Sequence, residues 1–291
     1  MTIFNAPALP PLPRPAVIRP AGQALLRPGA FRPVTHEERR LVIADLLRSK
    51  RLTRAEATVA MLFVPVAGWK HSSAATAPTV VSRSYYGDPS YTLSHSVPLP
   101  ASLVAGNLLI LVVGYSNGSA PQGQVTTPSG WTKLDSITGT NKALEYIFYK
   151  TATGSEGATL TVTSTNVARG MGFLAYQIAG WSGTPQIGTA ATGTNATPDP
   201  PSVTPTSAAS LALALCGGDG DGSPQTISSY PAGYSNGQVG ATTGTGSLLT
   251  GFAAGAEATI SGTSPVDPGT FALGFTPDEN WWAQTVIVNG A

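Results

Sequence analysis

"AGNLLILVVGYSN", residues 105–117, is the stretch that decides the fold class. Every residue from Leu108 to Val113 is apolar, and turn-forming Asn and Gly residues stand on both sides of the run. A short apolar run between turn signals is typical of a β-strand. The same character recurs along the chain after about residue 80, where charged residues are rare and Gly, Thr, Ser and Val are frequent.

Further segments of this kind predict strands. They are Ala143–Thr151, Ala158–Ser164, Met171–Trp181, Ser210–Gly217, Ser247–Ala254, Ala258–Ser264 and Trp281–Gly290. Turn clusters such as "GTNATPDPP" and "GGDGDGSP" separate them, and helical periodicity is almost absent. Many short strands with such turns predict a mainly β fold, an antiparallel, jelly-roll-like β-sandwich over residues 97–291.

The β region contains its own pattern twice. "LLILVVG" aligns with "LALALCG", "TPSGWTKL" with "YPAGYSNG", "GSEGATLTV" with "GAEATISG", and "FLAYQIAG" with "WWAQTVIVNG". Three aligned pairs are offset by 103, 101 and 107 positions: Trp131 with Tyr234, Glu156 with Glu257, and Gln177 with Gln284. We therefore expect quasi-repeated halves at about 97–183 and 203–291. They form either one sandwich, which we favour, or two small ones.

The first 70 residues have a different composition. They carry 11 Lys and Arg against four Asp and Glu, whereas residues 71–291 carry five against 11. Residues 1–34 contain eight prolines, which predict an extended arm. Two capping boxes, "THEE" from Thr35 and "TRAE" from Thr53, predict a helical hairpin over residues 35–70. Residues 71–96 are expected to be a linker and first strand region.

A basic arm on a neutral-to-acidic body suggests a docking segment. The residues expected to anchor it to a partner protein are Arg14, Arg19, Arg27, Arg32, Leu41 and Leu46. The arginines are interleaved with prolines rather than stacking aromatics, and no nucleic-acid-binding motif accompanies them, so we expect no nucleic acid partner. No apolar run reaches the roughly 20 residues that a spanning helix needs, so we expect no membrane insertion.

Catalytic signatures are weak, and we expect no enzyme activity and no cofactor. "GYSNG" occurs at Gly114–Gly118 and Gly233–Gly237, but neither copy precedes a helix as a nucleophile elbow requires. A hydrolase using Ser116 or Ser235 remains an alternative. Three scattered histidines and the single Cys216, which we expect to be buried, give no zinc spacing, and we expect no metal. "GGDGDG" lacks the later glutamate of a calcium loop.

Exposed aromatic residues are candidates for contact with a glycan. "SYYGDPSY" clusters three tyrosines, and Trp281–Trp282 forms a doublet whose two side chains face opposite sides of a strand. One tryptophan is then in the core and the other at the surface or at a subunit contact. The glycan candidates are Tyr85, Tyr86, Tyr91 and Trp282.

"AGNLLILVVGYSN", "TTPSGWTKL", "YKTATGSEGATLTVTS" and "GFLAYQIAGWSG" together resemble a β-sandwich module of virion proteins of tailed bacteriophages. That module has a "GDLLL" strand, a "P-x-GW" turn, a "SEPAT" strand and a closing "A-Y-x-G" strand. The resemblance covers about Pro98–Ala291. Asn107 stands where the module has Asp, and Gly157 follows Glu156 where it has Pro. No family is recognised for the first 70 residues.

The resemblance implies a non-enzymatic virion protein, such as a head decoration, spike, tail or fibre component, assembled in the host cytoplasm. Residues 1–70 would dock onto other capsid or tail proteins, and the body would be displayed as a homo-oligomer, with host attachment through a surface glycan as a further role. The alternative is a carbohydrate-binding adhesin that is not tied to a virion.

Overall fold

The computed structural model describes residues 75–90, 92–116, 124–137, 143–165, 170–219, 225–242, 251–275 and 280–291. Within these residues the protein is mainly β, its sheets are antiparallel, and it has no helix. The strands are β1 Thr79–Asp88, β2 Ser94–Pro98, β3 Leu108–Ser116, β4 Thr132–Ile137, β5 Ala143–Thr151, β6 Thr159–Thr163, β7 Met171–Ala179, β8 Trp181–Ile187, β9 Ala191–Gly193, β10 Ala209–Asp219, β11 Ile227–Ser229, β12 Ser235–Ala241, β13 Gly251–Ser261, β14 Ala272–Leu273 and β15 Trp281–Gly290. The arm at 1–34 and the helical hairpin at 35–70 lie outside the described residues.

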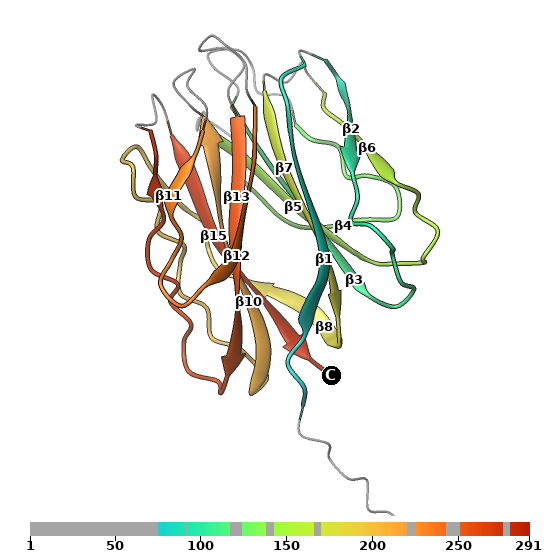
Figure 1. Cartoon of the computed structure of the whole chain (residues 1–291), viewed down its shortest axis with the longest axis vertical. Coiled ribbons are helices and arrows are strands. Elements are labelled where there is room, and N and C mark those ends of the chain that lie inside the picture. The colour runs from blue at the N-terminus through green and yellow to red at the C-terminus, as the bar shows by residue number, and fades with distance from the viewer. Residues whose placement is uncertain are drawn as a thin grey trace, which may run out of the picture. The chain divides into compact units, whose positions relative to one another are not determined.

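Two large sheets organise the described residues (Figure 1). The first has the order β1-β7-β3-β5-β4, and the second has the order β12-β13-β10-β15-β8, with β9 also paired to β15. Two smaller pairs, β2 with β6 and β11 with β14, lie outside these sheets. All the described residues belong to one compact unit.

The two large sheets have the same connectivity. The order β7-β3-β5-β4 in the first sheet corresponds to β15-β10-β13-β12 in the second, strand for strand along the chain. The correspondence extends to the small pairs: β2–β6 matches the bridge between Val203 and Val266, and β11–β14 matches the bridge between Val125 and Ser164. The turns before β4 and β12 also match. Trp131 N donates to Pro128 O at 3.0 Å, and Tyr234 N donates to Pro231 O at 3.1 Å.

Apolar side chains fill the space between the two large sheets. This inner cluster joins alternate residues of β3 and β7, such as Leu108 and Leu174, to residues of β10 and β15, such as Leu213 and Val286. Such alternation places every second side chain of a strand on one face. This cluster therefore connects the two large sheets through side chains of both.

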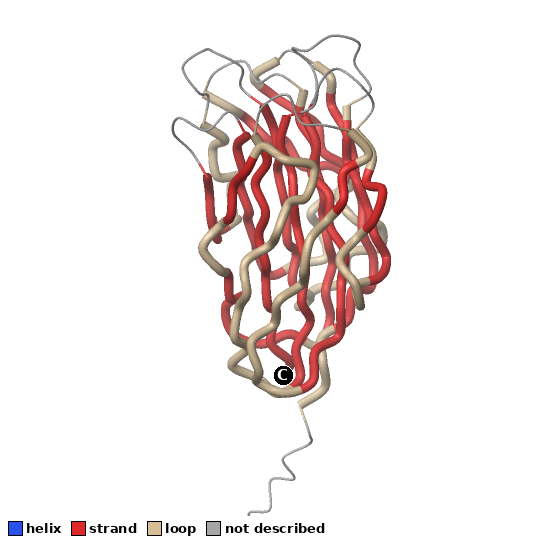
Figure 2. The backbone as a smooth tube through the Cα atoms, turned by 90° about the vertical axis from the view of Figure 1, so that its left-hand side faces the viewer, coloured by secondary structure: helices blue, strands red, loops and turns tan. Residues whose placement is uncertain are grey.

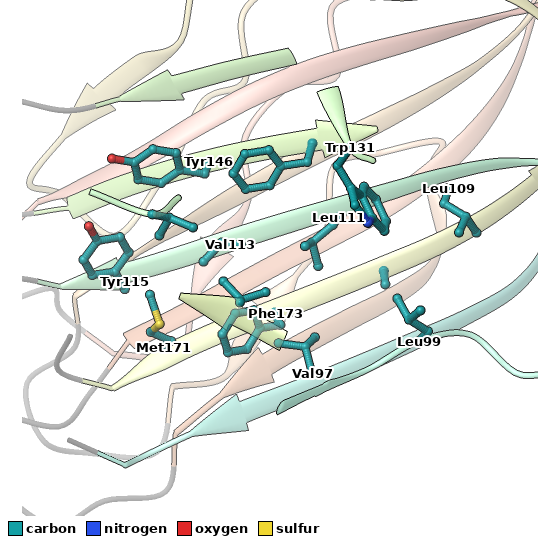
Figure 3. Packing of buried hydrophobic residues seen from close by; sticks show 14 of the residues in the cluster. Val97, Leu99, Leu109, Leu111, Val113, Tyr115, Trp131, Tyr146, Met171 and Phe173 are labelled. Carbon is teal, nitrogen blue, oxygen red and sulfur yellow. The ribbon is translucent and has the colours of Figure 1, made fainter. Parts of the chain in front are cut away.

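The outer face of each large sheet is covered as well. On the first sheet, Figure 3 shows Leu111, Val113 and Phe173 packed under Val97, which comes from β2, and Trp131, which comes from the turn before β4. The outer face of the second sheet is covered by loops and short strands that contribute Phe271, Leu273 and partly buried tyrosines. Central strands are thus buried on both faces, and all ten residues of β15 are buried. This double burial explains the continuous apolar runs in the sequence.

A row of small residues that ends in one large side chain crosses each large sheet. In the first sheet the paired residues are Gly87, Gly172, Gly114 and Glu145. In the second sheet they are Gly240, Ala253, Gly217 and Trp282. A Cβ on Gly172 would clash with the Gly240 carbonyl, and one on Gly240 would lie 2.6 Å from the Tyr86 carbonyl. Backbone meets backbone here because side chains are absent.

Irregular strand pairing is confined to the edges of the large sheets. The register shifts at Val80/Ser82 in β1, Lys133/Asp135 in β4, Ser235/Gln238 in β12, and where β8 meets β15. The four central pairings, β3 with β5 and β7, and β10 with β13 and β15, have no shift. Bulges on edge strands protect a sheet against pairing with a second chain.

Most of the strand predictions are confirmed, and three have wrong boundaries. The predictions at Ala143–Thr151 and Trp281–Gly290 match β5 and β15 residue for residue. The segment Met171–Trp181 is split into β7 and β8 at Gly180, whose φ of 72° breaks the strand. Residues 251–261 of the two segments predicted at 247–254 and 258–264 form one strand, β13, because "GAEA" continues through the sheet instead of turning.

The two ends of the large sheets are identified by the residues that lie there. Thr76, where the described chain enters, packs its carbonyl against Gly290, and Ala291 N donates to Gly180 O at 3.1 Å. We call this end the base; Figure 2 marks the C-terminus there. At the other end, the distal end, Tyr115 pairs with Met171 in the first sheet, and Gly218 pairs with Trp281 in the second.

Candidate functional site

An ion pair joins the two large sheets where β1 lies beside β12 and β13. Arg83 Nη2 of β1 donates to Glu257 Oε1 of β13 at 2.8 Å. About a quarter of the Arg83 side chain is exposed (26%), whereas Glu257 is nearly buried (11%). We call this place the seam and define it by Arg83, Tyr85, Tyr176, Asn236 and Glu257.

Asn236 adds a second donor to the same carboxylate oxygen. Its Nδ2 hydrogen-bonds Glu257 Oε1, and its backbone has a φ of 54°, in the left-handed region that a non-glycine residue rarely occupies. This conformation falls in the bulge of β12, between Ser235 and Gln238. The bulge therefore directs the Asn236 amide onto the carboxylate, as bulges near binding sites commonly do.

Tyr176 closes the seam from the interior. It pairs with Arg83 across β1 and β7, and its hydroxyl reaches the second sheet, where a Cβ on Gly255 would lie 2.5 Å from the Tyr176 Oη. Burial, with a smaller effect of the nearby Glu257 carboxylate, raises the pKa of Tyr176. The hydroxyl therefore stays protonated and remains able to donate.

Three buried polar atoms at the seam have no hydrogen-bond partner: Arg83 Nε, Glu257 Oε2 and Tyr176 Oη. Buried polar atoms are almost always satisfied in folded proteins, so three in one place point to hydrogen-bonding capacity that the chain itself does not use. Sequence reasoning missed this cluster. The available signal was weak: Arg83 is the only basic residue of β1, and Glu257 is the only charged residue of β13.

The glycan candidates do not lie together. Tyr85 shares a face of β1 with Arg83 and is 57% exposed. Tyr86 points to the other face, where its ring stacks near Phe173 at 6.4 Å and it is 37% exposed. Tyr91 lies outside the described residues.

Trp282 is fully buried, which corrects the expectation that it lies on the surface. Trp281 and Trp282 do face opposite sides of β15, but both sides are covered, so neither indole is exposed. The Trp282 ring fills the space that Gly114 and Gly217 leave between the sheets. It is not available to a glycan.

A buried carboxyl group lies beside Trp282 at the end of the glycine row. Glu145 of β5 is 0% exposed, and neither of its oxygens has a hydrogen-bond partner. Burial raises its pKa well above the ordinary value, and the neighbouring Asp135 carboxylate adds to the shift. Asp135 is itself held by Gln284, whose Nε2 donates to Oδ2 at 2.9 Å. This is a second polar cluster, and its Glu145 side chain is fully buried.

A buried histidine–aspartate pair lies near the start of β2. His95 Nδ1 is 2.9 Å from Asp88 Oδ2, and Ser90 N donates to Asp88 Oδ1 at 2.9 Å. Burial opposes ionisation of Asp88, but the bonds to Ser90 and His95 outweigh it and lower its pKa. The His95 ring packs against Phe173, so the pair fastens the segment from β1 to β2 onto the first sheet.

The structure also describes Ser235 and Cys216, two further candidates from the sequence. Ser235 of the second "GYSNG" is the first residue of β12, so a strand and not a helix follows it. Its hydroxyl donates to the Glu257 carbonyl at 3.4 Å. The first copy runs beyond the described residues, as does "GGDGDG". Cys216 is buried as predicted, and burial raises the pKa of its thiol.

Two kinds of feature are absent from the described residues. In those ranges no three His, Cys, Asp or Glu side chains are grouped to hold a metal ion. No helix there is long and apolar enough to cross a bilayer. The anchor candidates, Arg14, Arg19, Arg27, Arg32, Leu41 and Leu46, lie outside the ranges that the structure describes.

Comparison of the chain with protein-family models, with curated proteins and with solved structures finds no significant match.

Proposed function

We propose that this chain is a non-enzymatic structural component of a tailed-phage virion, which docks through residues 1–70 and displays its β body on the particle. The observation that carries the proposal is the separation of the two ends of the body. The chain enters at the base, where Thr76 lies against Gly290, and the distal strand ends around Tyr115 and Trp281 lie at the far side. A body whose chain enters at one end and whose strand ends lie at the other suits display on a surface.

The finer description of the fold belongs to the same proposal. We take the two face-to-face sheets as one jelly-roll-like β-sandwich of two quasi-repeated halves, at about 97–183 and 203–291. The matching strand orders of the two sheets support this view. A body whose central strands are buried on both faces, and whose edge strands carry bulges, can be displayed in many copies without pairing edge to edge.

The docking segment is the arm with Arg14, Arg19, Arg27 and Arg32, followed by the hairpin with Leu41 and Leu46. Prolines lower the entropy that an extended segment loses on docking, so a short arm can bind a partner capsid or tail protein effectively. We expect a homo-oligomer on the assembled virion, because virion components occupy symmetric sites.

Deleting residues 1–34 tests the docking role. We expect the truncated chain to be absent from purified particles while the body folds normally, because the arm rather than the body makes the attachment. The body's integrity is checked by comparing the thermal unfolding of the truncated and full-length chains. As a matched control, replacing Arg14, Arg19, Arg27 and Arg32 by Gln keeps the length of the arm but removes its charge. Normal incorporation of the deletion variant would overturn the proposal.

A second candidate function is carbohydrate binding by an adhesin, on or off a virion. The observation that favours it is Tyr85, an aromatic ring that is more than half exposed beside the polar groups of the seam. Aromatic rings that present an open face next to hydrogen-bonding groups suit the alternating apolar and hydroxyl surfaces of sugars. Binding of the full-length chain to a glycan array would support this function.

A further inference from the structure

We propose that the seam between β1 and β12 is a binding site for a neutral sugar, with Tyr85 as the stacking platform, Arg83 and Asn236 as the hydrogen-bonding groups, and Glu257 as the carboxylate that holds these two groups in place. This inference rests on the second candidate function, carbohydrate binding, and names the site that would perform it. It is independent of the docking role of residues 1–70.

The first step is the position of Tyr85 relative to the polar groups. The pairing of β1 with β7 is regular from Ser82 to Asp88, so Arg83 and Tyr85 point to the same side of the strand. Arg83 reaches Glu257 beside Asn236, and two residues beyond Tyr85, Gly87 meets the backbone of Ala241. The part of β12 between Asn236 and Ala241 therefore runs alongside Tyr85, and the ring lies on the same side of β1 as the Arg83 guanidinium.

The second step is the hydrogen-bonding capacity that remains at the seam. Glu257 Oε1 accepts from both Arg83 and Asn236, so the nearly buried carboxylate holds the two outer groups in place. Asn236 is exposed and about a quarter of the Arg83 side chain is exposed (26%), whereas Glu257 Oε2, Arg83 Nε and Tyr176 Oη are buried. A guanidinium can donate five hydrogen bonds, and an amide both donates and accepts. Sugar hydroxyls also donate and accept, so they match these two exposed groups.

The third step is charge, which separates a neutral sugar from an anionic ligand. The Arg83 guanidinium is already balanced by the Glu257 carboxylate at 2.8 Å, and the remaining groups, Asn236, Tyr85 and Tyr176, are uncharged. A phosphate, sulfate or carboxylate would meet Glu257 without an unbalanced cation to offset it. The seam therefore favours a neutral hexose or N-acetylhexosamine over an anionic sugar.

The fourth step is rigidity. Asn236 is fixed in a left-handed conformation by the bulge of β12, and Tyr176 is fixed by its passage over Gly255. Unusual backbone conformations held by their surroundings are frequent at ligand sites. Groups that are already positioned lose little entropy when a ligand binds, which matters for the weak contacts of a single sugar.

The test uses the full-length chain on an array of neutral glycans built from glucose, galactose, mannose and N-acetylglucosamine, together with sialylated and phosphorylated glycans. The affinity for the strongest neutral glycan is then measured for wild type, Tyr85→Ala and Asn236→Gly. Glycine accepts the left-handed backbone, so Asn236→Gly removes only the amide. We expect the affinity to fall at least about tenfold for Tyr85→Ala and several-fold for Asn236→Gly.

Val104→Ala is the matched control. Val104 is as exposed as Tyr85 but lies on the loop that covers the outer face of the first sheet, so its replacement should leave binding unchanged. Neutral-glycan binding that survives both seam substitutions would place the site elsewhere and leave carbohydrate binding standing. Binding to anionic glycans alone would overturn the assignment to a neutral sugar. Binding to none of the glycans would overturn the site and the second candidate function together, without touching the incorporation test of the arm.

Discussion

The indole of Trp282 lies directly over Gly114 from the opposite sheet, and a Cβ placed on Gly114 would be 3.1 Å from Trp282 Cζ2. Gly114 belongs to the row of the first sheet that contains Gly87 and Gly172, and Trp282 ends the corresponding row of the second sheet. The two large sheets approach each other here because one row lacks side chains. Trp282 fills the space where the rows end.

Replacing Gly114 by Ala should lower the free energy of unfolding by about 2–3 kcal/mol, because the new methyl group would clash with the Phe252 carbonyl and press on Trp282. Urea unfolding followed by tryptophan fluorescence measures the change. Gly106→Ala is the control: its φ of 89° makes alanine strained, but nothing lies within 4 Å of the added Cβ. A cost for Gly114→Ala no greater than that for Gly106→Ala would contradict the close approach of the sheets.

Replacing Glu145 by Gln should change how stability depends on pH. The pKa of Glu145 is raised well above 4.5 in the folded protein by burial and by Asp135, so the folded state holds its proton more tightly than the unfolded chain. Its favourable contribution is therefore complete below pH 4.5 and is lost as the pH rises toward the folded pKa. We expect Glu145→Gln to be more stable than wild type at neutral pH and to differ less at acid pH.

Urea midpoints measured from acid to neutral pH test this prediction. Glu145→Met provides a second neutral side chain of similar length, and it should flatten the same part of the profile. If wild type and both variants lose stability in parallel as the pH rises, Glu145 is not the group responsible, and its carboxylate must be solvated or paired in solution.

The fold class could be read from the central strands but not from the edges. Strands such as β3, β5 and β15 are buried on both faces, so their apolar residues are continuous and conspicuous in the sequence. β4 and β12 are edge strands with bulges, so their mixed polar sequences, TKLDSI and SNGQVGA, have neither a continuous apolar run nor a clean alternation. Their formation depends on pairing with β5 and β13, which no local pattern encodes.

The candidate site could be predicted only in part. Tyr85 was recognisable as an aromatic residue in a polar cluster, but its companions come from β12, β13 and β7, which are far away in the sequence. Alignment of the two halves pairs Glu257 with Glu156, yet Glu156 accepts bonds from its own turn whereas Glu257 crosses to Arg83. The expectation for Trp282 was wrong because it assumed that one face of β15 is exposed to solvent.

Trp282→Ala separates packing from binding. Removing a buried tryptophan should lower the free energy of unfolding by about 3–5 kcal/mol, because the cavity between Gly114 and Gly217 cannot close. Tyr85→Ala, at an exposed position, should change it by less than about 0.5 kcal/mol. Both values come from urea unfolding of the full-length chain. A Trp282→Ala variant as stable as wild type would show that the indole is not part of the core.

Glu156→Gln should make the protein less stable at neutral pH and no less stable at strongly acid pH. Burial opposes ionisation of Glu156, but bonds from Thr153 and Lys150 outweigh it and lower the pKa from 4.5 to about 2. Gly154 N also donates to it at 3.1 Å. Because the folded pKa is depressed, the carboxylate's contribution is complete above pH 4.5 and is lost as the pH falls toward 2.

The expected loss for Glu156→Gln at neutral pH is about 1–2 kcal/mol, the usual size for hydrogen bonds to a charged group. The difference from wild type should shrink below pH 4.5 and vanish near pH 2, as followed by urea midpoints. Asp199→Asn, which neutralises an exposed carboxylate, serves as the control and should change the free energy of unfolding at neutral pH by less than about 0.5 kcal/mol. A difference that stays constant across the acid range would mean that Glu156 acts through its shape and not through its charge.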